Sequence, residues 1–134
     1  DYFLNNFKFL KSYELNSSIN DLTNKTRLFV NTSIFTPHNQ LLASNFPCIF
    51  FWNKNIWNLD EEDEKFHNNE LLNKIFFKSA PEAAKFINTH YENIYDWWYS
   101  NEIQKIVNIY KEKYAHPIEN KADKIFNYLN SNLK

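Results

Sequence analysis

Two short apolar runs flank a compact amphipathic segment in the first half of the chain. The first run covers residues 28–30 and is followed by the polar residues 31–33, and the second covers residues 48–51 directly after Pro47. Apolar runs of this length, bounded by polar residues and proline, favour buried strands. The segment between them carries helix signals, so the pattern predicts a strand, a helix and a second strand, which together form one βαβ unit.

The helix of this unit has a start and a stop in the sequence. Thr36 is a good N-cap, Pro37 suits the first helical position, and Asn45 can adopt the left-handed conformation that ends a helix. The helix then begins at the carboxyl edge of the first strand, where open α/β sheets bind ligands, and its N-terminus favours phosphate. The residues that would line such a site are Thr32, Ser33, Thr36, His38 and Asn39.

An ordinary connection between strand and helix explains the same loop. Most strand-to-helix turns of α/β proteins bind no ligand, and the glycine-rich phosphate-binding fingerprint is missing because the chain contains no glycine. His38 could polarise a phosphate, but a histidine at a helix start is more often simply exposed to solvent. Both interpretations of the loop stay open at this stage.

Helix and strand signals continue along the rest of the chain. Capping boxes begin at Ser18 and Ser79, an acidic run begins at Asp60, and two later segments have apolar residues at helical spacing. Residues 1–15 fit either a strand or a packed extended arm. The other signals predict helices over residues 18–24, from residue 60, and over residues 79–89, 101–114 and 119–132, with a third strand over residues 75–77.

Length and composition indicate one globular domain. The chain is 43% apolar and 19% aromatic, which is enough to form a hydrophobic core. Its 134 residues are too few for two domains. We expect a single domain over residues 1–134, with a mixed α/β part over residues 1–80 and a helical part over residues 81–134. The chain begins with Asp1 and has no methionine, so we interpret it as a C-terminal fragment of a longer protein.

Charge and cysteine content argue against several classes of function. Fifteen basic and sixteen acidic residues give a formal charge of −1 without a basic cluster, so nucleic-acid binding is not expected. No run reaches the roughly 18 apolar residues of a spanning helix and no export signal is apparent, so we expect a cytoplasmic protein with no membrane span.

The acidic residues 60–64 point around a helix and no histidine lies at a chelating spacing, so no metal site is expected. Cys48, the single cysteine, fits a small buried hydrophobe.

The four tryptophans allow two interpretations. Trp52 and Trp57 lie on a polar loop after the second strand, where large aromatic residues act either as lids on the core or as ligand platforms. Trp97 or Trp98 is expected to clamp the following helix against the sheet, with Asp96 capping the turn. The alternative function is a non-catalytic interaction module, in which these aromatic residues are exposed and bind a protein partner.

An ordered set of short motifs resembles a known family. Thr36 is followed four residues later by Gln40, and the chain then continues with Leu42-Ala43-Ser44-Asn45-Phe46-Pro47, Ser79-Ala80-Pro81-Glu82-Ala83-Ala84, Asp96-Trp97-Trp98, Gln104 and Tyr114-Ala115. The set covers roughly residues 25–116 and resembles the C-terminal part of a family of transferases of bacterial surface-carbohydrate biosynthesis, which look like GT-B glycosyltransferases. The first motif is moderately specific, and the ordered set is much more specific.

The resemblance implies a fold and a function. The fold is α/β, a three-layer Rossmann-like half domain of GT-B type with a short, mainly parallel sheet and C-terminal helices that cross back onto an N-terminal half domain. This half would bind a nucleotide-sugar donor as substrate, with no cofactor, while the N-terminal half holds a carbohydrate acceptor. Gln40 stands where an acidic residue meets the ribose hydroxyls. No catalytic residue is identified, and the chain alone is expected to be inactive.

Overall fold

The computed structural model describes residues 6–8, 18–33, 36–52, 59–115 and 120–132. Most of the predicted N-terminal strand or arm, the tryptophan at position 57 and the predicted start of the last helix at residue 119 lie outside these residues. The fold is mixed α/β and mostly helical, and it is built around one short parallel sheet.

Three strands form the sheet in the order β1-β2-β3, and all of them are parallel. The strands are β1 (Phe29–Asn31), β2 (Cys48–Phe51) and β3 (Phe76–Phe77), which confirms the three strands predicted from the apolar runs. The register pairs Val30 with Ile49 and Phe50 with Phe76. The central strand β2 is apolar along its whole length because helices cover both of its faces.

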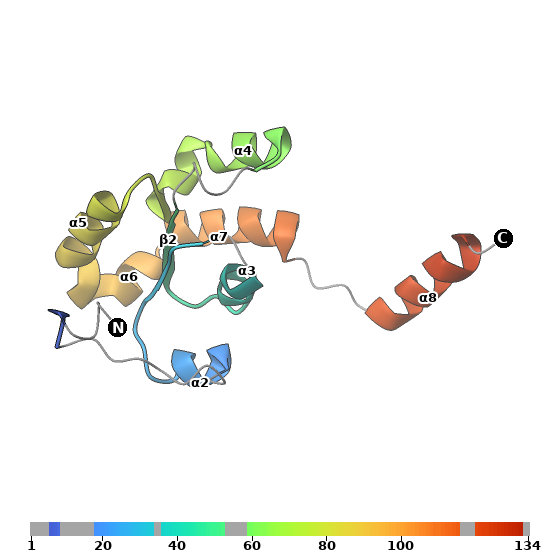
Figure 1. The fold of residues 1–134 in the computed structure, drawn as a ribbon, viewed down its shortest axis with the longest axis horizontal. Coiled ribbons are helices and arrows are strands. Elements are labelled where there is room, and N and C mark those ends of the chain that lie inside the picture. The colour runs from blue at the N-terminus through green and yellow to red at the C-terminus, as the bar shows by residue number, and fades with distance from the viewer. Residues whose placement is uncertain (1–5, 9–17, 34–35, 53–58, 116–119, 133–134) are drawn as a thin grey trace.

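Helices surround this sheet on both sides. Figure 1 shows α5 on one side of the sheet and α3 and α7 on the other, with α4 above α7. The helices are α2 (Ile19–Thr23), α3 (Thr36–Ala43), α4 (Glu61–His67), α5 (Ala80–His90), α6 (Ile94–Trp98), α7 (Asn101–Tyr114) and α8 (Lys121–Asn132), with two 3₁₀ turns, η1 (Glu70–Lys74) and η2 (Tyr91–Asn93).

Polar caps start the helices where the sequence predicted them, with two exceptions. Ser18 and Asp21 form a reciprocal capping box on α2, and Ser79 caps α5. Thr36, predicted as a cap, is instead the first residue of α3. Asp96 is not a cap either, because it lies exposed inside α6, and Ser100 caps α7 by accepting a hydrogen bond from the backbone N–H of Ile103.

The core lies between α7, α3 and the sheet. Its buried side chains come mainly from α3, β2, β3 and the inner face of α7, as the helical spacing of the α7 residues predicted. Trp98 is fully buried, and Trp52 and Trp97 are half-buried against the same cluster. The tryptophans that the structure describes therefore act as core or as lids on the core, and the interaction module built on exposed tryptophans is not supported.

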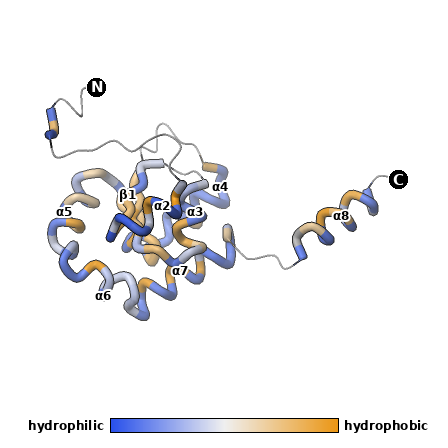
Figure 2. Tube along the Cα trace, turned by 90° about the horizontal axis from the view of Figure 1, so that it is seen from below, coloured by the Kyte–Doolittle hydropathy of each residue, from blue (hydrophilic) through white to orange (hydrophobic). Residues whose placement is uncertain are grey.

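Helix α8 differs from the other helices because its apolar stripe is exposed. It stands away from the rest of the described structure (Figures 1 and 2). Ile125, Phe126 and Leu129 have exposed fractions of 51%, 65% and 50%. The predicted helix is confirmed, and its apolar stripe packs on no other described residue, while the expected crossing of this helix onto an N-terminal half domain stays a prediction.

Candidate functional site

The chain leaves β1 at the carboxyl edge of the sheet through a side-chain turn. The Asn31 Oδ1 atom lies 3.4 Å from both the backbone nitrogen and the hydroxyl oxygen of Ser33, and it accepts from each. Such turns redirect a chain without glycine. Thr32 is exposed and Ser33 is half-buried, so these two predicted residues lie at the sheet edge from which the chain continues to α3.

Helix α3 has one exposed and one buried side. Thr36 and Gln40 are exposed, as a site facing solvent requires, and they lie four residues apart on one helix face. His38, expected to be exposed, has only 4% of its surface accessible. The exposure prediction is wrong because His38, Leu41 and Leu42 share the buried side of α3, which packs against α7.

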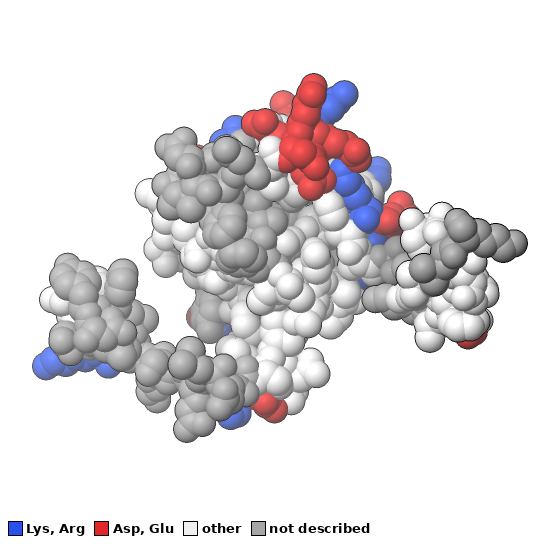
Figure 3. Space-filling model, turned by 45° about the vertical axis from the view of Figure 1, so that its right-hand side comes forward, with Lys and Arg blue, Asp and Glu red and all other residues white. Residues whose placement is uncertain are grey.

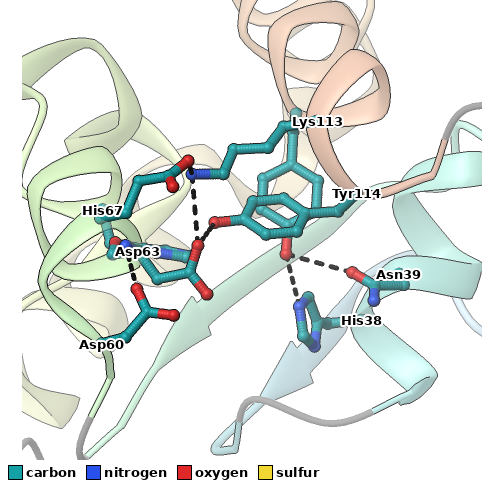
Figure 4. Close-up of polar contacts among 9 residues, drawn as sticks. His38, Asn39, Asp60, Asp63, His67, Lys113 and Tyr114 are labelled. Atoms are coloured by element: carbon teal, nitrogen blue, oxygen red, sulfur yellow. Dashed lines mark hydrogen bonds and ion pairs between the residues drawn. The ribbon is translucent and has the colours of Figure 1, made fainter.

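Tyr110 on α7 links two neighbouring side chains of this turn (Figure 4). Its hydroxyl lies 2.5 Å from the Nε2 atom of His38 and donates to the Oδ1 atom of Asn39 at 3.1 Å. Because a phenol has a single proton, this arrangement makes the His38 Nε2–H the donor to the tyrosine oxygen. Burial raises the pKa of Tyr110 far above its ordinary value, so the hydroxyl stays neutral and keeps its proton.

A second polar cluster joins α4 to the last turn of α7 (Figure 4). The Tyr114 hydroxyl donates to the Asp63 Oδ1 atom at 2.5 Å, and the Lys113 ammonium lies 3.2 Å from the same oxygen and 2.9 Å from a Glu62 oxygen. The hydrogen bond from Tyr114 and the positive charge of Lys113 hold the pKa of Asp63 below its ordinary value. Burial and the hydrogen bond to Asp63 raise the pKa of Tyr114. This cluster therefore favours an ionised Asp63 beside a neutral Tyr114.

His67 is the last residue of α4 and lies one turn after Asp63. Its Nδ1 atom donates to the backbone carbonyl oxygen of Asp63 at 2.8 Å, which fixes the ring. The ring is buried and meets the rings of Trp52, Phe66 and Phe76 edge-on at centroid distances of 5.1 to 5.4 Å. This histidine was not among the predicted site residues, although its four-residue spacing from Asp63 on a helix is visible in the sequence.

Three residues of the motifs that carried the family resemblance, Asn45, Trp98 and Gln104, meet at the opposite end of α3. The Trp98 Nε1–H donates to the backbone oxygen and the Oδ1 atom of Asn45, at 3.0 and 3.1 Å. The Gln104 amide donates to the Asn45 Oδ1 atom and to the Trp98 carbonyl oxygen, and it accepts from the Asn45 amide. Asn45 has φ of 54°, so it ends α3 in the left-handed conformation that the sequence predicted. These three residues hold the fold together, and they do not line the sheet edge where α3 begins.

Acidic surface charge gathers over α4. Figure 3 shows acidic side chains gathered at the top of the molecule, where α4 lies, with lysine side chains beside them. In the part of the chain that the structure describes, no group of three or more histidine, cysteine and acidic residues is arranged to hold a metal ion. No helix among the described residues is long and apolar enough to cross a membrane.

Comparison with known proteins gives the family. Searches of curated proteins and of solved structures found no significant match. The model of the LIC12162 family transferase matches residues 1–128, which is nearly the whole chain. The chain therefore belongs to the LIC12162 family of transferases.

Proposed function

We propose that this chain is the donor-binding half of a glycosyltransferase-like enzyme of GT-B type. In this proposal the chain binds a nucleotide-sugar donor in the cytoplasm, and an N-terminal half domain of the same protein holds the carbohydrate acceptor of a bacterial surface polysaccharide. Membership of a transferase family supports the reaction class. The parallel sheet with helices on both faces supports the fold type that the motif order resembles.

The observation that carries the proposal is the position of α3. Strands β1 and β2 are parallel neighbours and α3 connects them, so the first turn of α3 starts at the carboxyl edge of the sheet. Backbone N–H groups of a first turn point out of the helix end, and the helix dipole favours a negative charge there. A diphosphate bound at this turn would lie near Thr32, Ser33 and Thr36.

The buried side of the same turn gives it a fixed geometry. The side chains of His38 and Asn39 both contact Tyr110, so we assign them the role of holding the turn and not of contacting the donor through their side chains. Their contribution to phosphate binding would come from the backbone, which Pro37 cannot supply because it has no N–H.

Gln40 is the residue that we assign to the ribose hydroxyls. It is exposed, and it lies one turn further along the same face as Thr36. A neutral amide can hydrogen-bond a hydroxyl, but a carboxylate is the stronger acceptor. Replacing the amide with a carboxylate therefore tests whether a sugar hydroxyl lies against this position.

Calorimetric titration with nucleoside diphosphates, a nucleoside and inorganic phosphate tests the proposal. We expect weak, millimolar-range binding of a nucleoside diphosphate to the wild-type chain, because the acceptor half of the cleft is not part of it. Thr36→Ala should weaken diphosphate binding with little loss of stability, because Thr36 is not a cap. Gln40→Glu should tighten nucleoside binding several-fold and leave inorganic phosphate unaffected.

The control for the added charge is Asn88→Asp on α5, where the side chain is exposed and lies in the half of the helix furthest from the carboxyl edge. It should change neither nucleoside nor phosphate binding. No heat and no NMR chemical-shift change at millimolar ligand would count against a donor site in this chain. If neither Thr36→Ala nor Gln40→Glu changes the affinity, the ligand binds elsewhere on the chain.

A further inference from the structure

Helix α4 is too short to be stable by itself. It has seven residues, and among them only His67 is buried, with Phe66 and Asp63 half-buried. Isolated helices shorter than about 12 residues are marginal in water. The Asp60 side chain caps its first turn at 2.8 Å, but a cap alone cannot hold one helix of this length. The helix must therefore be kept in place by its contacts with the rest of the fold.

The ion pairs and the hydrogen bond that join α4 to α7 go to a single turn of that helix. Tyr114 donates to Asp63, and Lys113 pairs with Asp63 and Glu62. The Lys113 ammonium also lies 4.8 Å from the centre of the Phe66 ring, and Tyr114 meets that ring edge-on at 5.3 Å. Figure 4 shows the two side chains of α7 reaching α4 from one end of their helix. This part of the attachment is local, polar and partly open to solvent, and the buried His67 ring adds aromatic contacts with Trp52 and Phe76.

We propose that α4 is a latch that opens separately from the core and is held shut by Asp63, Lys113 and Tyr114. The core consists mainly of residues from α3, β2, β3 and α7, so these elements keep their packing when α4 leaves. Segments with few buried apolar contacts open at a lower free energy than the whole domain. The titratable and charged groups that act on Asp63 are Lys113 and Tyr114 from α7 and His67 from α4 itself, and Lys113 also pairs with Glu62.

Opening the latch would uncover a set of aromatic rings at the carboxyl end of the sheet. The His67 ring covers Trp52 and Phe76 edge-on, and Tyr110 lies within 6.1 Å of it, measured between ring centroids. Tyr110 is also the residue that contacts the first turn of α3. The latch therefore controls access to rings that adjoin this turn, whether or not a nucleotide binds there.

Hydrogen exchange of the α4 and core amides in the intact chain tests this inference. In the wild type, α4 amides should exchange faster than the amides of α3 and of the buried part of α7. Tyr114→Phe removes one hydrogen bond to a carboxylate and should speed α4 exchange on the order of tenfold. Lys113→Gln should act in the same direction, whereas Lys111→Gln, a change of equal charge in the same helix turn, should not.

A core variant separates local opening from global unfolding. Ile103→Val lies eleven residues before Tyr114 on α7, and its side chain is 1% exposed, so it weakens packing that an open latch would keep. It should speed exchange of core amides by a few-fold and leave α4 exchange unchanged. If Ile103→Val speeds α4 as much as the core, then α4 opens only with the whole domain and the inference is wrong. Unchanged α4 exchange in Tyr114→Phe would equally overturn it.

Discussion

Truncation of Trp98 should lower the stability of the fold more than truncation of any other described side chain. Its side chain is fully buried within the core, and its single N–H is shared between two oxygens of Asn45. The residue thereby joins α6 to the end of α3, in addition to filling the space beneath α7. Replacing it with alanine removes the largest fully buried side chain of the described structure and the hydrogen bond together.

The expected loss follows from these two contributions. Removing a buried tryptophan costs about 3 to 5 kcal/mol because the surrounding structure collapses only in part. Trp98→Phe keeps an aromatic ring but loses the N–H, so it should cost the hydrogen bond, about 1 kcal/mol, and a similar amount for the smaller ring. The total free energy of unfolding of a domain of this size is about 5 to 15 kcal/mol. Trp98→Ala should therefore leave the chain close to unfolding, and it should lower Tm by more than about 10 °C.

Urea and thermal unfolding followed by circular dichroism measure both losses. Trp97→Ala is the matched control, because this neighbouring side chain is only half-buried and packs on Phe86 at a ring-centroid distance of 4.7 Å. We expect the loss of unfolding free energy to fall in the order Trp98→Ala, Trp98→Phe and Trp97→Ala, with the last two close together. A loss well under about 1 kcal/mol for Trp98→Ala would refute the packing argument.

Three further predictions concern single groups. The pKa of Asp63 is lowered in the folded state, so its contribution to stability is complete above its unfolded pKa of about 4 and is lost as pH falls through the folded pKa. Tyr114→Phe should make the unfolding free energy depend less on pH in this acid range, as measured by urea unfolding at a series of pH values. Cys48 is fully buried and its thiol pKa is raised, so a thiol reagent should label it only in urea. Asn45→Gly should cost less stability than Asn45→Ala, since both lose the amide but only glycine favours the positive φ.

Local signals predicted most of the elements because each of them acts within a few residues. The capping residues Ser18 and Ser79 and the left-handed Asn45 stand where the sequence placed them. The strands followed from apolar runs that only a sheet covered on both faces would bury. Helix α3 begins at Thr36, one residue earlier than predicted, and a difference of one residue is usual at a helix boundary.

Contacts between distant residues could not be predicted in this way. The hydrogen bonds of Asn45 with Trp98 and Gln104 join positions 53 and 59 residues apart, and no local pattern specifies such a pairing. The burial of His38 was readable in part, because Leu41 and Leu42 follow it at helical spacing. Its contact with Tyr110 depends on how α3 and α7 pack, and this arrangement is a property of the tertiary fold.

The structure divides the motif residues of α3 into two groups with different roles. Asn45 at the end of the helix has a structural role, because it carries hydrogen bonds from both α6 and α7. Thr36 in the first turn and Gln40 one turn further along have exposed side chains and make no side-chain hydrogen bond to other described residues. A residue type that packing and internal hydrogen bonds do not require is the better candidate for contact with a ligand. Variants at Thr36 and Gln40 can therefore test function with little effect on folding, whereas variants at Asn45, Trp98 and Gln104 test the fold.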